Sequence, residues 1–313
     1  MSACRGLDSV GQMANHQTVR FYLEPPLRES AAAGAHNFIG LIAKVCAAAG
    51  LVPQYCDLAD AGLANGGYAL THMKPPERPN GLVFRRVYQY PFWQIDQTAA
   101  RWDWDTAQAK FDPSQIDLAE AARFFAFWQK RLYGAAPKVT KQAGYIYVPL
   151  QGRLSEHRSF QSCSPLQMLE HCLAHEPLRQ VIATLHPNEH YSAAELAALE
   201  HLERQHARLT VTVGDMVQHL QNCDYVVTQN SSAAFGGFFF QKPALLFAKI
   251  DFHHIAVRAD MADLAESFAQ VTRNTPDYAQ YIWWFWQDQS INAGRTDAEA
   301  KIAARLRRFG WPI

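Results

Sequence analysis

The stretch from Asp224 to Ile255 (DYVVTQNSSAAFGGFFFQKPALLFAKIDFHHI) constrains the fold more than any other part of the chain. Its first residues, Asp224–Gln229, form a short run of β-branched and aromatic side chains that is typical of a buried strand. Asn230-Ser231-Ser232 follow, and Asn and Ser are preferred helix N-caps because their side-chain oxygens accept hydrogen bonds from first-turn N–H groups. The sequence therefore predicts a helix over Ala233–Gln241 and a second strand over Ala244–Lys249.

The Ser231-Ser232 pair admits two interpretations. Hydroxyls and free N–H groups at a helix start, just beyond the carboxyl end of a strand, form an anion site. Open α/β sheets bind their ligands at that edge. Simple helix capping explains the same residues equally well, so the motif alone leaves both interpretations open.

A second strand–loop–helix unit favours the anion site. Arg179–Leu185 (RQVIATL) predicts a strand, and His186-Pro187 follow at its end. Ser192 and Glu195 have the spacing of a capping box that opens the next helix. If the strands are parallel, His186 and the Ser231-Ser232 pair lie at the same edge of one sheet. An imidazole and two hydroxyls that converge there would suit a phosphate.

Composition narrows the class of protein. The 313 residues carry a formal net charge of zero, which argues against a dedicated nucleic-acid binder because such proteins have a basic face. No run approaches the roughly 18 apolar residues of a membrane span. Residues 1–17 resemble a loose leader without the apolar core of a signal peptide. We therefore expect no membrane span and a cytoplasmic location.

Cysteine spacing supports the same compartment. The six cysteines are scattered and form no CxxC pair, which predicts reduced, mostly buried thiols rather than a disulfide framework or a zinc site. They are Cys4, Cys46, Cys56, Cys163, Cys172 and Cys223.

Strands followed by helices recur through both halves of the chain. The polar segment Gly134–Gly144 separates the halves, so we expect one domain over residues 1–138 and another over 139–313. The pattern predicts an α/β fold of two Rossmann-like, doubly wound domains that face a cleft. The helical end of the chain, Thr296–Phe309, could also cross back over the first half.

Three carboxylates of the first half are candidates for catalysis. Glu77 lies in a polar, Pro-rich loop, and such loops are often binding elements. Asp96 and Asp103 lie among tryptophans and a phenylalanine, and aromatic rings beside carboxylates can stack on a sugar and hydrogen-bond to it. The alternative is that the rings pack in the core and the carboxylates are surface or capping groups.

The second half offers a further loop at a strand exit. Gln151-Gly152-Arg153 follow the predicted strand Tyr145–Leu150. Gly152 permits a close backbone approach, and Arg153 or Arg158 could reach a phosphate. The alternative for the arginines is a solvated loop. His253 follows the last strand of the second half and completes the candidate donor-binding set.

Three elements carry a resemblance to a known family: Thr184-Leu185-His186-Pro187, Gln229-Asn230-Ser231-Ser232 and Lys242-Pro243. With them the chain resembles bacterial glycosyltransferases of the GT-B kind, and in particular the capsule polysaccharide biosynthesis group with its Kdo transferases. The paired HP and SS motifs are also similar to those of bacterial sialyltransferases and of the glycerophosphotransferases of teichoic acid synthesis. The resemblance covers residues 145–257.

The resemblance implies a nucleotide-activated sugar donor in the second half. His186 would contact its phosphate or ribose, and Ser231 and Ser232 its phosphate or a donor carboxylate. The sugar, plausibly from a CMP-sugar such as CMP-Kdo, would pass to a saccharide or glycolipid acceptor in surface or capsular polysaccharide synthesis. No metal and no resident cofactor are expected, and peripheral membrane association is compatible with this role.

The chain departs from the family pattern in two places. It has no clear Asp/Glu-Asp/Glu-Gly motif for the catalytic acid that the first half would supply, and Phe235-Gly236-Gly237-Phe238 lacks the carboxylate that many members carry after the Ser pair. A non-catalytic nucleotide- or sugar-binding protein of the same fold is therefore an alternative. A metal hydrolase is another, since four histidines lie at strand exits and could hold zinc. They are His186, His190, His253 and His254.

Overall fold

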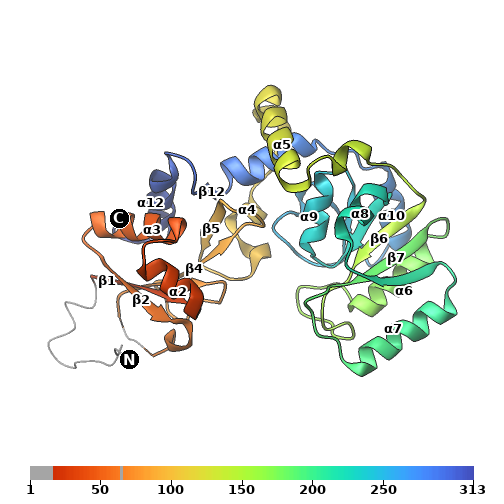
Figure 1. The fold of residues 1–313 in the computed structure, drawn as a ribbon, viewed down its shortest axis with the longest axis horizontal. Coiled ribbons are helices and arrows are strands. Elements are labelled where there is room, and N and C mark those ends of the chain that lie inside the picture. The colour runs from red at the N-terminus through yellow and green to blue at the C-terminus, as the bar shows by residue number, and fades with distance from the viewer. Residues whose placement is uncertain (1–16, 64–65) are drawn as a thin grey trace. The chain divides into compact units, whose positions relative to one another are not determined.

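The computed structural model describes residues 17–63 and 66–313. Except for Gln17, the predicted leader lies outside the described residues, as does Cys4. The chain forms two compact units (Figure 1): the first takes the chain up to Gln108 together with Phe285–Ile313, and the second is Ala109–Trp284. This division differs from the expected boundary at 138/139, because the chain leaves the first unit earlier and returns to it at the end.

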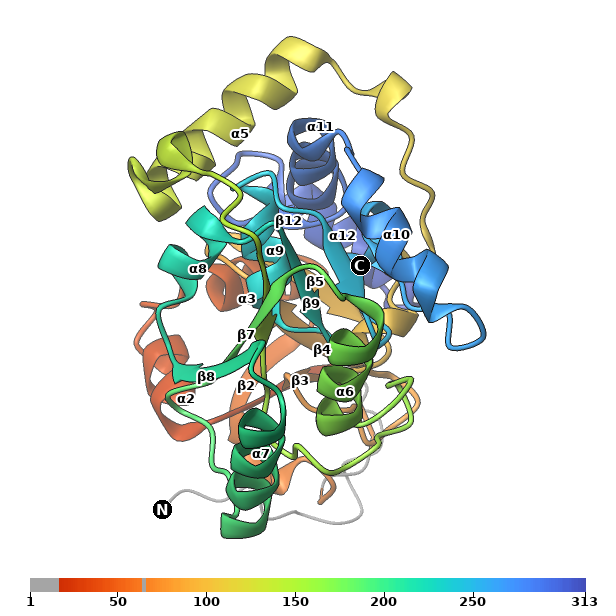
Figure 2. The ribbon, with the colours of Figure 1, turned by 90° about the vertical axis from the view of Figure 1, so that its right-hand side faces the viewer.

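The second unit is built on a fully parallel sheet of six strands in the order β11-β10-β9-β6-β7-β8 (Figure 2). Its strands are β6 (Tyr145–Pro149), β7 (Gln180–Leu185), β8 (Leu209–Val213), β9 (Tyr225–Thr228), β10 (Ala244–Leu246) and β11 (Val257–Arg258). The central strands are apolar runs that are buried on both faces, as parallel sheets require. The stretch from Asp224 to Ile255 thus supplies β9, a helix and β10, as predicted.

Helices cover both faces of this sheet. The helices α6 (Pro165–His175), α7 (Ala193–Gln205) and α10 (Leu264–Arg273) share one apolar core with it, to which Val227 of β9 belongs. The neighbouring residue Val226 points the other way, towards Gly237 of α9 (Ser232–Phe238). The helix α8 (Met216–Asn222) lies beside α9 on this second face. Alternation along β9 therefore directs successive side chains into two helical layers.

Two further helices explain where the second unit begins and ends. The helix α5 (Leu118–Tyr133) packs against α11 (Tyr278–Trp283), and its Phe125 ring stacks on Phe239 with centroids 5.3 Å apart. Phe125 and Trp128 of α5 therefore belong to the core of this unit, whereas Phe127 is 58% exposed. The chain joins the second unit before α5 rather than after it.

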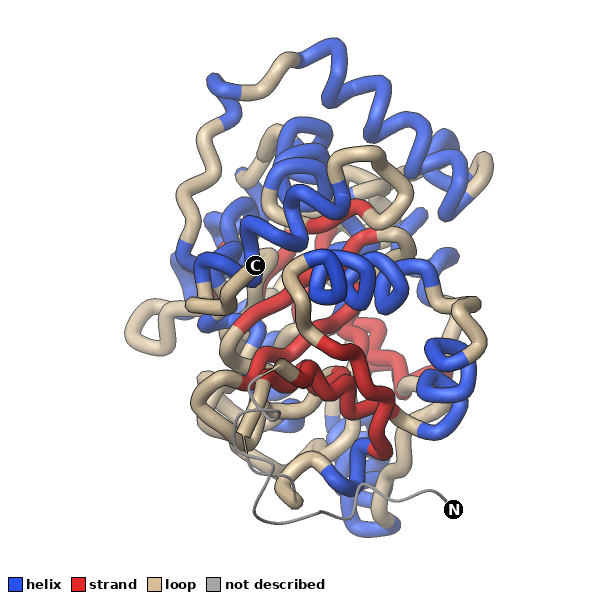
Figure 3. The backbone as a smooth tube through the Cα atoms, turned by 90° about the vertical axis from the view of Figure 1, so that its left-hand side faces the viewer, coloured by secondary structure: helices blue, strands red, loops and turns tan. Residues whose placement is uncertain are grey.

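The first unit has a mixed sheet of six strands in the order β12-β5-β4-β3-β1-β2 (Figure 3). They are β1 (Thr18–Leu23), β2 (Val52–Asp57), β3 (Tyr68–His72), β4 (Gly81–Arg86), β5 (Phe92–Asp96) and β12 (Ile291–Asn292). The strands β1 to β4 are parallel, whereas β5 and β12 pair antiparallel at one side. The strand β4 ends at Arg86, and Phe92–Asp96 is a strand of its own.

Helices from both ends of the chain pack on this sheet. The helix α3 (Asn37–Ala48) buries Phe38, Ile39 and Ile42, and the helix α12 (Ala298–Arg308) adds Ile302 and Leu306 to the same core. The C-terminal segment therefore completes the first unit, which realises the crossing-back that the sequence left open.

The helix α2 (Pro25–Ala32) does not appear in the prediction. The sequence suggests that Pro25 and Pro26 merely interrupt the chain, yet they occupy the first turn of α2. Proline is favourable there, because first-turn N–H groups have no partner inside the helix and the fixed φ of proline matches the helical value. Glu24 becomes the N-cap residue of this helix.

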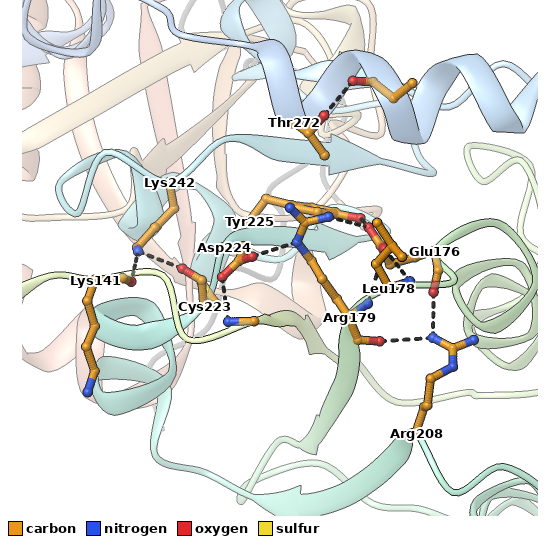
Figure 4. A network of polar contacts seen from close by, with 12 residues as sticks. Lys141, Glu176, Leu178, Arg179, Arg208, Cys223, Asp224, Tyr225, Lys242 and Thr272 are labelled. Atoms are coloured by element: carbon orange, nitrogen blue, oxygen red, sulfur yellow. Dashed lines mark hydrogen bonds and ion pairs between the residues drawn. The ribbon is translucent and has the colours of Figure 1, made fainter.

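A buried ion-pair network holds the amino edge of the second unit's sheet together (Figure 4). Arg179, just before β7, binds Glu176 at 3.0 Å and Asp224 at 2.6 Å. Tyr225 donates its hydroxyl hydrogen to Glu176 at 2.6 Å. Lys242 is buried here and donates to two backbone carbonyls, those of Lys141 and Cys223. The Lys-Pro pair of the resemblance is therefore part of the scaffold.

The described cysteines are buried and form no disulfide, and burial raises the pKa of Cys46 and of Cys223 to about 12. These thiols are inert core residues, as predicted. Among the helices that the structure describes, none is by itself long and apolar enough to cross a bilayer; α2 and α3 satisfy that criterion only as a pair, bent by 58°.

Candidate functional site

The order of strands in the second unit creates a topological switch point between β6 and β9. From β6 the chain proceeds to β7 and β8 on one side, and from β9 to β10 and β11 on the other. Loops that leave two neighbouring strands in opposite directions open a crevice at the carboxyl edge, where doubly wound sheets bind ligands. The loops that begin at Leu150 and Gln229 flank this point.

The loop after β6 is shaped by Gly152, which is buried. A side chain at this position would begin 2.5 Å from a carboxylate oxygen of Glu189, so glycine lets the loops after β6 and β7 pack together. Arg153 is exposed, with φ at +65°, and binds Glu156 at 3.2 Å.

The loop after β9 begins the helix α9. The Ser231 hydroxyl oxygen accepts the N–H of Ala233 at 3.2 Å, so Ser231 is a genuine N-cap. Capping occupies one lone pair of the oxygen and leaves its O–H free to donate. Ser232 is exposed, and Asn230 lies beside the loop after β10 through a 3.5 Å contact with the carbonyl of Lys249.

His186 follows β7 and is exposed together with Pro187. Its Nδ1 accepts the backbone N–H of Asn188 at 3.2 Å, and the backbone N–H of His186 donates to the hydroxyl of Tyr191 at 2.9 Å. Acceptance at Nδ1 places the proton of the neutral ring on Nε2. The local turn thus leaves the Nε2–H of His186 as the group that can donate a hydrogen bond to a ligand.

The expected meeting of His186 with the Ser231-Ser232 pair needs correction. Both follow strands of one parallel sheet and lie at its carboxyl edge, as expected. However, β6 lies between β7 and β9, and two strand spacings amount to roughly 10 Å. A single phosphate group would not reach from one to the other directly, whereas an extended ligand such as a nucleotide would.

Four buried polar atoms near the switch point have no hydrogen-bond partner among the described residues. They are Oε1 of Gln151, Nε of Arg158, Nε2 of Gln161 and Oε1 of Gln229. Gln161 and Gln229 are only 6% and 2% exposed. Buried polar groups are nearly always hydrogen-bonded in native proteins, so this cluster indicates a site for a polar ligand or ordered water.

The sequence shows this cluster only in part. Gln229 belongs to the QNSS motif, and Arg158 was a candidate phosphate ligand. Gln161 gives no signal, because its position depends on an isolated bridge to Ala248. Burial and the neighbouring Arg153 lower the pKa of Arg158, against the opposing carboxylates Glu156 and Glu189. Arginine is charged throughout the physiological pH range nonetheless.

His253 is held by its own turn. Its Nδ1 lies 2.8 Å from the carbonyl oxygen of Ile250, its ring stacks on His254 with centroids 4.3 Å apart, and burial lowers its pKa. Both of these partners belong to the loop of His253 itself rather than to the loop of Ser231 and Ser232. The described residues also contain no group of three or more potential metal ligands, so the four histidines of the hydrolase alternative do not assemble.

The three candidate carboxylates of the first unit differ in their surroundings. Glu77 is exposed and lines a cavity of about 360 Å³ with Gly62 and Arg78. Asp96 is buried and binds Arg305 at 2.6 Å. Asp103 is exposed in a 3₁₀ turn, Arg101–Asp103. Asp96 is thus engaged in the fold, whereas Glu77 and Asp103 are exposed to solvent.

Gly236 and Gly237 explain the missing carboxylate after the Ser pair in physical terms. A side chain at 236 would begin 2.8 Å from the hydroxyl of Tyr133, and one at 237 would begin 3.4 Å from Leu220 and Val226. Both positions face the interior, so a carboxylate there would be buried against apolar groups.

Two Rossmann-like α/β units, each with a parallel-dominated sheet, define the chain as a member of the GT-B fold class. No family model and no curated protein matches the sequence. Among solved structures, the chain is similar to KpsC of Thermosulfurimonas dismutans, a beta Kdo 2,7 transferase, with a TM-score of 0.50 and 12% identity over 85% of this chain and 88% of that one.

Two further structures are similar at lower scores. KpsC of the same organism, described as a beta Kdo 2,4 transferase, has a TM-score of 0.49 and 12% identity, covering 82% of this chain and 90% of that one. UDP-GlcNAc 2-epimerase from Neisseria meningitidis has a TM-score of 0.34 and 13% identity, covering 93% and 99%. At 12% identity, the likeness to the first of these structures concerns the fold alone.

Proposed function

We propose that the chain is a glycosyltransferase that binds a nucleotide-activated sugar at the carboxyl edge of the second unit's sheet. The observation that carries this proposal is the switch point between β6 and β9 together with the buried polar atoms of Gln151, Arg158, Gln161 and Gln229, which have no hydrogen-bond partner among the described residues. A polar ligand of nucleotide size would satisfy them and reach the flanking hydrogen-bond donors.

The polar and charged side chains at this edge have a chemical role in transfer. Breaking the bond between the sugar and the nucleotide leaves negative charge on the departing phosphate. Nε2–H of His186 and the guanidinium groups of Arg153 and Arg158 are suited to stabilise that charge. The hydroxyls of Ser231 and Ser232 lie about two strand spacings from His186 and are suited to the carboxylate of the donor sugar. Because α9 has only seven residues, the proposal depends on these side chains rather than on a helix dipole.

The donor class follows from the motifs. The HP and SS elements at these strand exits resemble those of transferases that use CMP-sugars, and KpsC, a Kdo transferase, has this fold. We therefore propose a CMP-sugar such as CMP-Kdo as donor and a saccharide or glycolipid of a surface or capsular polysaccharide as acceptor. Hydrogen-bond donors and charged groups of the protein are proposed to stabilise the leaving phosphate without a metal ion. Transfer should therefore persist in excess EDTA, which removes divalent metal ions.

A thermal-shift panel tests the proposal. The protein is heated with CMP, CDP, UDP or GDP, and a nucleotide that binds only the folded state raises the melting temperature. Transfer is then measured with the sugar conjugate of the nucleotide that binds. Binding with transfer supports the proposal. Binding without transfer or donor hydrolysis would favour the non-catalytic alternative, and no stabilisation by any nucleotide would contradict both.

A further inference from the structure

The helix α5 of the second unit buries one side and exposes the other. Its buried residues are Ala121, Phe125 and Trp128, and their spacing of four and then three residues places them on one side of the helix. The helix packs against α11 and runs along the outside of the second unit (Figure 2). The opposite side of α5 therefore faces away from the core of this unit.

Two charges and an aromatic ring lie together on this outward side, which we call the α5 face. Its residues Arg123, Phe127 and Lys130 repeat the spacing of four and then three, so they share one side of the helix. All three are exposed, and Phe127 is 58% exposed. A single exposed apolar side chain is ordinary on a protein surface, so the significance of Phe127 depends on the groups around it.

The surrounding charge is strongly biased towards basic residues. Residues 118–141 contain five basic side chains and one acidic side chain, whereas basic and acidic residues balance over the whole chain. The single acidic residue, Glu120, accepts a hydrogen bond from Nε1 of Trp283 at 3.1 Å. The five basic residues are all exposed, and they are Arg123, Lys130, Arg131, Lys138 and Lys141. This part of the chain therefore presents a net positive charge.

The same segment exposes further apolar surface. Leu118, the first residue of α5, is 70% exposed, and Val139 is 67% exposed. Val139 ends a 3₁₀ turn, Ala136–Val139, which follows α5 and contacts it. Large apolar side chains and positive charges are thus concentrated in one segment of the second unit. Such a combination is typical of a surface that binds a partner with both apolar and anionic character.

We propose that the α5 face docks the protein on the surface of an anionic membrane. Arg123 and Lys130 attract the phosphates of anionic lipid headgroups, and the basic residues that follow α5 add to this attraction. The Phe127 ring enters the boundary between headgroups and acyl chains. Charge and apolar burial act together there, which neither could achieve alone. The inference is independent of the transferase assignment, because it concerns α5 and not the edge of the sheet.

Two other occupants fit the α5 face less well. A second copy of the chain in a two-fold dimer would bring the same patch to both sides of the contact, and its like charges would repel each other. The phosphates of a nucleic acid would pair with Arg123 and Lys130. They would give no apolar environment to Leu118 and Val139, whereas the membrane interface accommodates both kinds of side chain.

Vesicle sedimentation tests the proposal. The full chain is mixed with vesicles of phosphatidylcholine alone or of phosphatidylcholine with phosphatidylglycerol, and the bound fraction is measured at low and at high salt. We expect binding to the vesicles that contain phosphatidylglycerol, and we expect salt to weaken it because counterions screen the attraction. Absence of binding to these vesicles at low salt would overturn the proposal, and so would equal binding to both kinds of vesicle.

A charge variant locates the contact. Each basic side chain near an anionic surface strengthens binding about 5-fold, so Arg123→Gln combined with Lys130→Gln should weaken binding about 25-fold. The matched control is Arg204→Gln combined with Arg273→Gln, which removes two exposed charges from α7 and α10. The control should bind the vesicles as the wild type does.

An aromatic variant tests the apolar part of the contact. Phe127→Ser should weaken binding about 10-fold, because the ring no longer leaves water when the protein docks. Leu178→Ser is its control, since Leu178 is 86% exposed and lies outside the α5 segment. Circular dichroism confirms folding, and if one of the two α5 variants fails to fold, the other decides the matter.

Two results would overturn the docking surface itself. One is wild-type affinity for the vesicles in the folded α5 variants. The other is a dimer, measured by light scattering, that Phe127→Ser abolishes, because this result would assign the α5 face to a second copy of the chain. These assays contain no nucleotide sugar, so their failure is distinguishable from a failure of the proposed transferase function.

Discussion

The carboxylate of Asp96 in β5 lies 2.6 Å from Nη2 of Arg305 in α12, although 209 residues separate them along the chain. Asp96 is 4% exposed and also accepts the backbone N–H of Gln97. Arg305 donates further to the carbonyl of Ile95. This contact joins the last helix of the chain to a strand of the first unit.

We predict that Arg305→Ala destabilises the first unit. Removing one partner of a buried pair leaves the other charge without compensation, which costs about 3–5 kcal/mol. Chemical denaturation followed by tryptophan fluorescence measures the free energy of unfolding. Arg295→Ala is the control, because Arg295 forms an exposed 3.6 Å pair with Asp297, worth at most about 1 kcal/mol. Equal effects of the two variants would contradict the prediction.

The Glu176 network predicts acid sensitivity of the second unit. Burial opposes ionisation of Glu176, but hydrogen bonds from Tyr225 and Leu178 and the charge of Arg179 hold its pKa below the usual value. The folded state therefore binds this proton at lower pH than the unfolded state, in which the pKa of a Glu carboxyl is about 4.3. The stabilisation is complete above that pH and is lost as pH falls through the folded pKa.

Melting temperatures between pH 6 and pH 3 test this expectation. The wild type should lose stability steeply below the unfolded pKa, and Glu176→Gln should be less stable at pH 6 with a shallower dependence. Glu266→Gln is the control, since Glu266 forms an exposed pair with Arg273. A Glu176→Gln profile parallel to that of the wild type would refute the assignment.

Ser231→Asp separates capping from ligand binding. Asp is as good an N-cap as Ser, so the fold should be retained, with a melting temperature close to that of the wild type. A carboxylate at position 231 would repel the carboxylate of the donor sugar, and the thermal shift by the CMP-sugar should disappear. Ala197→Asp adds the same charge to an exposed position on α7 and should leave the shift intact. Undiminished binding by Ser231→Asp would remove Ser231 from the site.

His186→Ala should lower turnover without unfolding the protein. Loss of one donor that stabilises developing charge typically costs about 10²- to 10³-fold in kcat. His186 is exposed, so the melting temperature of the His186→Ala variant should stay close to that of the wild type. His190→Ala, in the same loop, is the control and should retain turnover. Full turnover of His186→Ala would show that His186 has no role in transfer. If both variants lost turnover equally and added zinc restored it, the result would support the metal alternative instead.

The sequence by itself determined the local elements and their edges. Apolar runs predicted the strands around Tyr145, Val181 and Val226, and the Ser-x-x-Glu spacing predicted the start of α7. The same patterns indicated that His186 and Ser231 follow parallel strands of one sheet. These features depend on hydrophobic periodicity and on hydrogen bonds between near neighbours, which a sequence displays directly.

Only the tertiary structure decided which strands are neighbours. It placed β6 between β7 and β9, which separates His186 from Ser231, and it returned α12 to the first unit, where Arg305 engages Asp96. It also brought Glu24 to His72 across the switch point between β1 and β3. Strand order and these pairings result from packing between residues distant in the chain, and no local pattern encodes them.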